Sequence, residues 1–246
     1  QEKSLCPLRP AIGRASVLLF ALGLPLAHLV AAPARDSRFS FGLDVDPTRF
    51  PLETSETLAR LPSGRTMNDW HLGGYLIWRR IPEGVYCDGR GLLVYPDSWY
   101  REMVAATESS PALEAHADRW DIAYGLGAYE LMFGSAMMQS QHWIPIHHGL
   151  ASTLFVRRKH VESVRQAGIL PLELLRAQPD AGWMARWYDP ILANPVMLSE
   201  LEREILAASA ATRNAPVVLE TLAYVAHARP DVHAHLVERL AGQVHP

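Results

Sequence analysis

Residues 67–90, MNDWHLGGYLIWRRIPEGVYCDGR, carry the strongest indication of the fold. The stretch begins within GRTMN, which predicts a short β-strand, and Asn68 or Asp69 follows where the N-cap of a helix is expected. Near its end VYC predicts a second strand, and Asp88-Gly89-Arg90 predicts the turn that closes it. A strand, a helix and a strand in this order predict a β-α-β unit whose two strands pair in parallel.

The helix of this unit carries its larger apolar residues on one predicted face. The residues of that face, which we expect to point inward, are Trp70, Gly73, Gly74, Ile77 and Trp78, at i, i+3, i+4, i+7 and i+8. Each glycine costs roughly 1 kcal/mol of helix propensity relative to alanine. We therefore expect the glycines to allow a close approach of this helix to the sheet. Their adjacent placement lacks the GxGxxG spacing of a dinucleotide-binding loop.

Strand and helix patterns continue downstream. Helices are predicted at residues 96–107, 112–120 and 128–140, a strand at 121–126, and a closing hairpin at 142–158 with its turn at His148-Gly149. Further helices are predicted at Leu172–Arg176, Leu198–Ala210, Ala215–Ala228 and Val232–Leu240. The sequence thus predicts an α/β domain at residues 41–160, with a small open, largely parallel sheet, flanking helices and a closing hairpin. A helical, repeat-like region at 161–246, which ends in an α-helical hairpin, is expected to follow.

An apolar segment without formal charge, Ala15–Ala34, precedes the predicted α/β domain. About 20 apolar residues suffice for a helix to cross a bilayer, so we expect one transmembrane helix at 15–34. Three cations lie in the flank at residues 1–14 and favour a cytoplasmic position for it: Lys3, Arg9 and Arg14. The expected location is the bacterial inner membrane, with the residues after 34 facing the periplasm or the cell exterior.

Two alternatives to a membrane span remain open at this stage. The segment also fits a signal peptide that ends at Ala32-Pro33-Ala34, although proline makes a poor cleavage site. A buried helix of a soluble protein is the second alternative. Because the sequence begins with Gln1 rather than Met, we expect a processed chain or a piece of a longer protein.

Charge and metal-ligand content exclude several classes of function. The formal net charge is −3 and the Lys and Arg residues are scattered, so no nucleic-acid partner is expected. Cys6 and Cys87 flank the apolar segment, so we expect no disulfide, and a buried position for Cys87. The histidines that a zinc site would need are His71, His142, His147 and His148. Adjacent histidines in a strand point to opposite faces, so we expect no metal and no cofactor.

The run from Pro62 to Met103 resembles the soluble C-terminal region of bacterial multi-spanning membrane proteins related to lipid-linked-sugar-dependent glycosyltransferases. The matching positions are Asn68, Trp70, Gly73, Gly74, Tyr75, Trp78, Asp88, Gly89, Arg90, Tyr95, Trp143 and Arg157. The resemblance covers roughly residues 41–158. It implies an extracytoplasmic domain that follows a last membrane span. It also implies that the catalytic acidic residue lies in an external loop upstream of this chain.

The candidate site lies beyond the carboxyl ends of the first two predicted strands, where ligands bind in open α/β sheets. The candidate ligand-binding residues at this place are Asn68, Asp69, His71, Asp88 and Arg90. Carboxylates beside Arg90 are suited to hold a sugar hydroxyl or the phosphate of a lipid-linked donor. In the structural alternative, Asn68 and Asp69 cap the helix while Asp88 pairs with Arg90.

Three functions are compatible with the sequence. The first is a non-catalytic extracytoplasmic domain of a polytopic glycosyltransferase-like protein, which binds a lipid-linked sugar or an acceptor. The second is a membrane-anchored interaction module whose protein partner binds the C-terminal helices. The third is a stand-alone anchored hydrolase in which Asp69, Asp88 and His71 serve as acid and base. The absence of a recognisable catalytic motif weighs against the third, and membrane lipid is an expected partner in all three.

Overall fold

The computed structural model describes residues 45–244, with gaps at 82–84, 130, 178–179 and 213. The chain divides into two compact units, residues 1–46 and 47–246, and the second contains the elements described below. The predicted transmembrane helix at Ala15–Ala34 and its flank lie outside the described residues. Within the described part of the chain, no helix combines the length and apolar character that crossing a bilayer requires.

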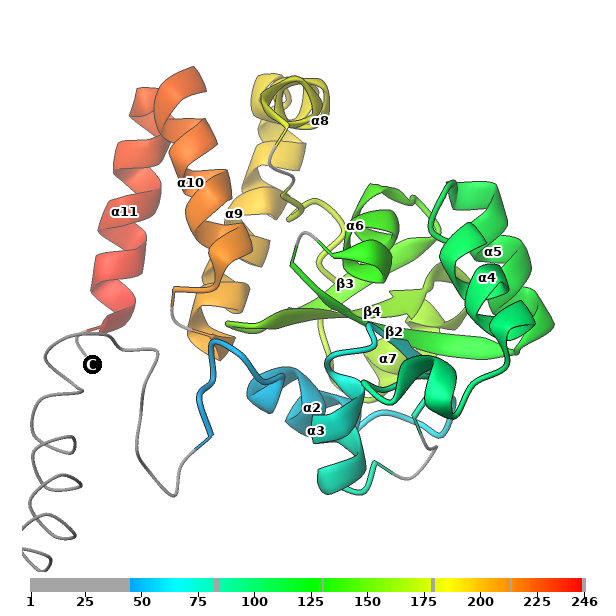
Figure 1. The fold of residues 1–246 in the computed structure, drawn as a ribbon. Coiled ribbons are helices and arrows are strands. Elements are labelled where there is room, and N and C mark those ends of the chain that lie inside the picture. The colour runs from blue at the N-terminus through cyan, green and yellow to red at the C-terminus, as the bar shows by residue number, and fades with distance from the viewer. Residues whose placement is uncertain (1–44, 82–84, 130, 178–179, 213, 245–246) are drawn as a thin grey trace, which may run out of the picture. The chain divides into compact units, whose positions relative to one another are not determined.

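A four-stranded sheet forms the centre of the second unit, in the order β1-β2-β4-β3 (Figure 1). Its strands are β1 (Arg65–Asn68), β2 (Ile122–Ala128), β3 (Trp143–His148) and β4 (Ser152–Arg157). β1 pairs with β2 in parallel, whereas β4 pairs with both β2 and β3 in antiparallel fashion. The α/β class and the closing β3–β4 hairpin are confirmed. The prediction of a largely parallel sheet is wrong, because the sheet is mixed.

The predicted second strand at residues 85–87 does not form, and the side chain of Asn68 provides the reason. Asn68 Nδ2 donates to the Cys87 carbonyl oxygen over 2.8 Å, and its Oδ1 accepts from the Tyr86 N–H over 3.1 Å. A side-chain amide thus satisfies backbone groups that a neighbouring strand would otherwise bond. The strand parallel to β1 is instead β2, and the connection between them is a long helical crossover.

Helix α3 (Gly73–Trp78) follows β1, but it buries a different face from the one predicted. Its buried residues include Tyr75 and Leu76, whereas Ile77 and Trp78 are exposed. A Cβ atom on Gly73 would lie 1.9 Å from the carbonyl oxygen of Cys87, so only glycine permits this contact. Gly73 therefore packs against residues 87–88 rather than against the sheet, and this contact turns the tryptophan face outward.

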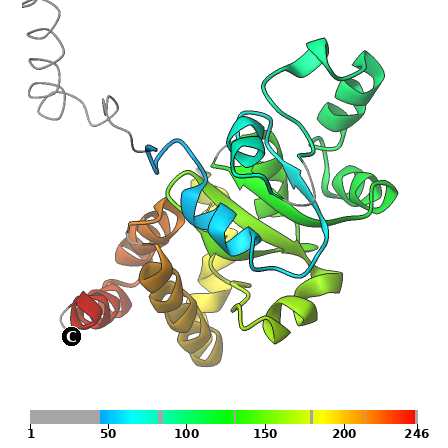
Figure 2. The same ribbon diagram turned by 90° about the horizontal axis from the view of Figure 1, so that it is seen from below.

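The remaining elements of the α/β part flank the sheet on both faces (Figures 1 and 2). They are α2 (Leu52–Leu58), η1 (Gly91–Leu93), α4 (Asp97–Ala105), α5 (Ser110–Arg119), α6 (Met132–Gln139), η2 (Arg158–His160) and α7 (Val161–Gln166). One buried cluster joins Met67, Phe133 and Trp143 on the face covered by α5 and α6. A second joins Leu76 and Leu154 with residues of α2 and α7. The predicted helices at 96–107 and 112–120 are confirmed, and the helix predicted at 128–140 forms from Met132 onward, because Ala128 belongs to β2.

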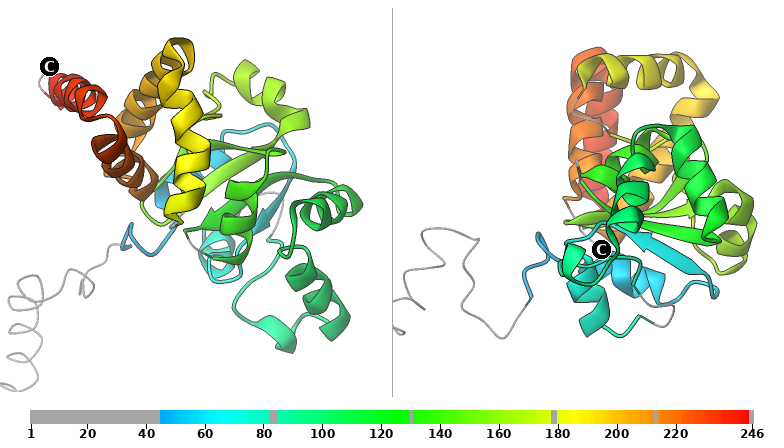
Figure 3. Two further views of the ribbon diagram at one scale, coloured as in Figure 1. Left: turned by 90° about the horizontal axis from the view of Figure 1, so that it is seen from above. Right: turned by 45° about the vertical axis from the view of Figure 1, so that its right-hand side comes forward.

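Four helices form the C-terminal part and lie beside one another at one end of the sheet (Figures 1 and 3). They are α8 (Ala181–Ala193), α9 (Pro195–Ala211), α10 (Pro216–Ala228) and α11 (Pro230–Val244). The last three confirm the helices predicted at 198–210, 215–228 and 232–240. The helix predicted at Leu172–Arg176 is wrong, because these residues are irregular. Helix α8 has no counterpart among the predictions.

The irregular segment at residues 172–176 is held by two buried charged side chains. Glu204 of α9 accepts hydrogen bonds from the N–H groups of Glu173, Leu174 and Leu175, at 2.9, 2.9 and 2.7 Å. The guanidinium of Arg176 donates to the carbonyl oxygens of Met138, Ser140 and Trp143, next to the sheet. Because a carboxylate from another helix takes up three consecutive N–H groups, the local helix signal is overridden.

Glu204 makes the stability of this junction depend on pH. Burial raises the pKa of its carboxyl to about 7, from 4.5, against the effect of the three N–H donors. At pH values between these two pKa values, Glu204 is protonated in the folded chain and ionised in the unfolded chain. We therefore expect the free energy of unfolding to fall as pH rises through this interval. The contribution of this group is at most on the order of 3 kcal/mol.

The matched variant is Glu204→Gln, which cannot ionise. It is expected to remove this part of the pH dependence, whatever its effect on absolute stability. Urea unfolding of both proteins at pH values below, within and above the interval measures the two slopes. Equal slopes in the wild type and the variant would contradict the assignment.

Candidate functional site

Asp69 anchors the start of α6 rather than the start of α3. Its Oδ2 accepts from the Ala128 and Gly134 N–H groups, at 2.9 and 3.2 Å, and its Oδ1 accepts from the Phe133 N–H at 3.0 Å. Phe133 and Gly134 belong to the first turn of α6, where free N–H groups favour an anion. The predicted cap of the adjacent helix by Asn68 or Asp69 is therefore wrong, because α3 begins after Leu72.

The carboxylate of Asp69 is buried, and both of its oxygens accept these bonds. It is 1% exposed, and this burial raises the pKa of its carboxyl while the three N–H donors lower it. Asn68 is equally buried and binds the backbone at residues 86–87. Both side chains thus join β1 to neighbouring segments, and neither presents a polar atom to a ligand.

Asp88 and Arg90 form the ion pair that the structural alternative predicted. Arg90 Nε and Nη2 donate to the two oxygens of Asp88 over 2.8 and 2.6 Å, and the hydroxyl of Tyr95 donates to Oδ2 over 2.9 Å. The guanidinium holds the pKa of the Asp88 carboxyl well below its usual range. Asp88 is buried whereas 59% of the Arg90 side chain is exposed, so the pair presents a cation to solvent.

The structure brings only some of the candidate residues together. Asn68 contacts the segment that leads into Asp88, and the Cβ position of Gly73 lies 2.8 Å from the Asp88 Cα. His71 is exposed, next to the buried Asp69. The carboxylates of Asp69 and Asp88 point to different partners. These residues therefore support the local fold, and the open space lies next to them.

That space is an aromatic cleft of about 240 Å³ beside the Asp88–Arg90 pair. Its lining consists of Arg65, Thr66, Val85, Tyr86, Tyr95, Trp99, Trp120 and Ile122. The rings of Tyr95 and Trp99 stack with centroids 4.6 Å apart, and Tyr86 lies 5.0 Å from Trp99. The volume approaches the lower end of small-molecule sites, roughly 300 Å³. We call this feature the aromatic cleft.

The elements that build the aromatic cleft are distant in sequence. Arg65 and Ile122 stand at the amino ends of β1 and β2, the opposite edge of the sheet from the predicted one. Asn68 holds Tyr86 in place through its backbone, and α4 supplies Trp99. The sequence predicted only a helix at residues 96–107 and gave Trp99 no role in a site, so the cleft was not predicted. The sequence feature that could have indicated the cleft is the close spacing of Tyr86, Tyr95 and Trp99 around the DGR turn.

A polar network behind the aromatic cleft orients its rings. The hydroxyl of Tyr86 bonds His116 Nε2, and His116 Nδ1 lies 3.2 Å from Glu102 Oε1. The indole N–H of Trp120 donates to the same Glu102 oxygen over 3.2 Å. Burial raises the pKa of the Tyr86 phenol and lowers that of His116. Through these contacts the network holds the rings of Tyr86 and Trp120 in place.

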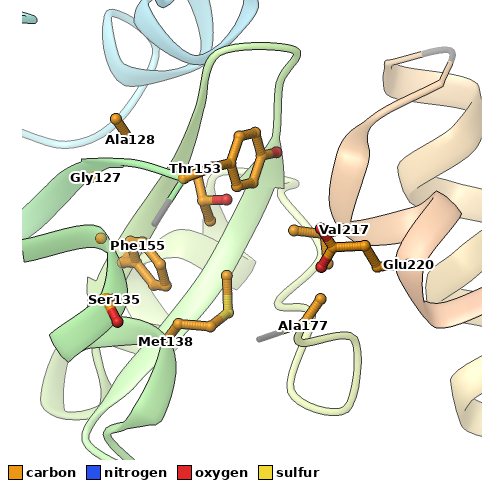
Figure 4. A pocket seen from close by; sticks show the side chains of 11 residues that line it. Gly127, Ala128, Ser135, Met138, Thr153, Phe155, Ala177, Val217 and Glu220 are labelled. Atoms are coloured by element: carbon orange, nitrogen blue, oxygen red, sulfur yellow. The ribbon is translucent and has the colours of Figure 1, made fainter. Parts of the chain in front are cut away.

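A second cavity lies at the carboxyl end of β2, between the sheet and α10 (Figure 4). Thr153 and Phe155 approach it from the sheet, and Val217 and Glu220 approach it from α10. Its volume is about 30 Å³. One water molecule occupies a comparable share of liquid volume, roughly 30 Å³, so this cavity is too small for a sugar.

The two histidines of β3, His147 and His148, form hydrogen bonds with hydroxyl and carbonyl groups. His147 lies between the hydroxyls of Thr57 and Thr212, at 2.7 and 2.9 Å. His148 bonds the Thr153 hydroxyl and the Leu175 carbonyl oxygen, at 2.9 and 3.1 Å. Burial lowers the pKa of His147 to about 4 and that of His148 to about 3, so both are neutral. In the part of the chain that is described, no three His, Cys, Asp or Glu side chains are placed to hold a metal.

Comparison of the chain with protein-family models, with curated proteins and with solved structures gives no match. Function is therefore inferred from the aromatic cleft and from the resemblance in the sequence.

Proposed function

We propose that this chain is a non-catalytic extracytoplasmic domain of a membrane glycosyltransferase-like protein, and that its aromatic cleft binds the sugar of a lipid-linked donor or acceptor. The observation that carries the proposal is the cleft itself, in which Tyr86, Tyr95 and Trp99 gather beside a solvent-facing cation. The resemblance around the GGYLIW and DGR elements supports the membrane context.

The chemistry of the aromatic cleft suits a sugar phosphate. A pyranose ring has apolar C–H faces that pack on aromatic rings, and hydroxyl edges that need polar partners. Trp99 and Tyr95 supply a stacked aromatic wall, and Arg65 lies at the rim. Arg90 is joined to the wall through Asp88 and the Tyr95 hydroxyl. Nε and Nη2 of Arg90 are already bound to Asp88, so Arg90 offers its Nη1 group, and Arg65 its remaining guanidinium donors, to a phosphate oxygen.

A binding role fits the geometry better than hydrolysis by Asp69, Asp88 and His71. A general acid or base needs a free oxygen within reach of the substrate. Both oxygens of Asp69 are bonded to backbone N–H groups, and both oxygens of Asp88 are bonded to Arg90. The proposal therefore leaves the chemistry to residues upstream of this chain, as the resemblance implies.

The test is titration of the full chain, kept in detergent, with a polyprenyl phosphate that carries one hexose. Heat of binding is measured for the wild type, for Trp99→Ala and for Tyr100→Ala. We expect Trp99→Ala to bind at least tenfold more weakly, a loss of about 1.4 kcal/mol or more. Tyr100 is on the same helix and outside the cleft lining, so Tyr100→Ala is expected to bind like the wild type.

Two results would overturn the proposal. One is the absence of saturable binding by the wild-type chain. The other is an equal affinity of the Trp99→Ala variant, because the ligand would then bind elsewhere. A circular dichroism spectrum identical to that of the wild type confirms that the variant is folded.

A further inference from the structure

We propose a second contact surface, in which the outer face of α3 rests on the headgroup region of an anionic lipid bilayer. We call it the α3 face and define it by Trp70, Gly74, Ile77 and Trp78. Trp70 is 49% exposed, Ile77 46% and Trp78 64%. Trp70 lies in the turn before α3, and Ile77 and Trp78 end the helix, so three large apolar side chains are exposed within nine residues, more than ordinary surface variation explains.

The apolar surface continues beyond α3. The ring of Trp78 lies 5.5 Å from the ring of Tyr75, and Tyr75 lies 5.6 Å from Phe50. Phe50 is 38% exposed and stands just before α2. Phe50 thus adds an exposed apolar side chain that is joined to Trp78 through the buried ring of Tyr75.

The residue types on the patch favour lipid headgroups over a protein partner. Tryptophan combines an apolar ring with an N–H donor and concentrates at the membrane–water interface. Arg79 and Arg80 directly follow the same helix and are exposed. Arg79 lies 4.0 Å from the exposed Glu56, at the limit of an ion pair, so its charge stays available. A cation beside an anionic membrane surface is attracted to it, so these two arginines favour the bilayer as the partner.

The length of the chain before α2 is compatible with this contact. The apolar segment predicted to enter the bilayer ends at Ala34, and the second compact unit begins at Pro47. The residues between them span at most roughly 40 Å even when fully extended. Under the prediction that Ala15–Ala34 enters the bilayer, the tether to the second unit has this maximum length.

Gly74 offers a position from which to test the contact. A Cβ atom there would meet nothing within 4 Å among the described residues, so a label at this site is accommodated. Gly242 of α11 is equally open and is exposed, and it serves as the matched control. Cys87 is buried and burial raises the pKa of its thiol, so it does not compete for the label. The remaining cysteine is removed by Cys6→Ser.

The experiment places the full chain, with Gly74→Cys or Gly242→Cys carrying a nitroxide, in nanodiscs of phosphatidylglycerol and phosphatidylcholine. Electron paramagnetic resonance compares collisions with oxygen, which concentrates in lipid, and with a water-soluble nickel chelate. We expect the oxygen-to-nickel ratio to be several-fold higher at position 74 than at position 242. The added changes Ile77→Ser and Trp78→Ser should lower the ratio at 74 to that at 242.

Three results would overturn this proposal. Equal ratios at the two positions would show that the α3 face is in water. A label at position 74 that is shielded from both reagents would show that protein covers the face. Failure of the nanodiscs to retain the chain would remove the bilayer as a partner. None of these outcomes depends on sugar binding, so this proposal and the proposed function fail separately.

Discussion

Replacement of Arg176 with methionine is expected to lower the free energy of unfolding by about 4 kcal/mol. Arg176 is 2% exposed. Its Nη1 donates to the carbonyl oxygens of Met138 and Ser140, both at 2.8 Å, and its Nη2 donates to that of Trp143 at 2.7 Å. Its guanidinium also lies over the ring of Trp187, 5.3 Å from the centroid. Methionine fills much of the volume but leaves three buried carbonyl groups without these donors.

This effect comes from geometry rather than from charge alone. Burial lowers the pKa of Arg176 to about 10, so the side chain is still a cation at neutral pH. The carbonyl groups it binds lie at the end of α6 and the start of β3. One planar fork therefore joins the sheet to the segment that leads into the C-terminal helices, and its removal weakens both parts.

Urea unfolding followed by circular dichroism measures the loss. Arg158→Met is the matched control, because Arg158 is 51% exposed and pairs with Glu173 at the surface. Its expected cost is below about 1 kcal/mol. A loss of similar size in the two variants would contradict the role assigned to Arg176.

The second large effect is expected from Asp69→Ala, at about 3 kcal/mol. The substitution leaves the N–H groups of Ala128, Phe133 and Gly134 without their acceptor in a site that water does not reach freely. Two of these N–H groups, those of Phe133 and Gly134, lie in the first turn of α6. Because α6 packs on β2, the loss of the acceptor also weakens the central sheet. We expect α6 to open locally before the rest of the chain unfolds.

Hydrogen exchange distinguishes this local effect from a general loss of stability. The amides of Phe133 and Gly134 should exchange faster in the variant than those of β4. Asp97→Ala is the matched control, because Asp97 is exposed and pairs only with Arg101 among the contacts of its carboxylate that the structure shows. Uniform acceleration across the sheet in Asp69→Ala would exclude the proposed role as an anchor of α6.

Local patterns predicted much of the secondary structure. The apolar and turn patterns of residues 142–158 gave the β3–β4 hairpin, and the patterns of residues 195–244 gave three of the C-terminal helices. These signals succeed because binary alternation and proline breaks act within a few residues. The pairing of Asp88 with Arg90 could be predicted for the same reason, because both residues belong to one turn.

The failures share a different cause. The strand expected at 85–87 and the helix expected at 172–176 were both replaced by bonds from distant side chains, Asn68 and Glu204. The orientation of α3 followed from the space that Gly73 leaves for a backbone carbonyl group. No short window of sequence contains both partners of such a contact.

The α/β class, the closing hairpin and the helical C-terminal region follow from the amino-acid sequence alone. The cap of α6 by Asp69 and the aromatic cleft at the amino ends of β1 and β2 follow only from the folded chain. It also placed Trp70 and Trp78 at the surface. The physical reason is that helix and strand periodicity depends on near neighbours, whereas a buried polar group takes whichever partner the folded chain brings within hydrogen-bond distance.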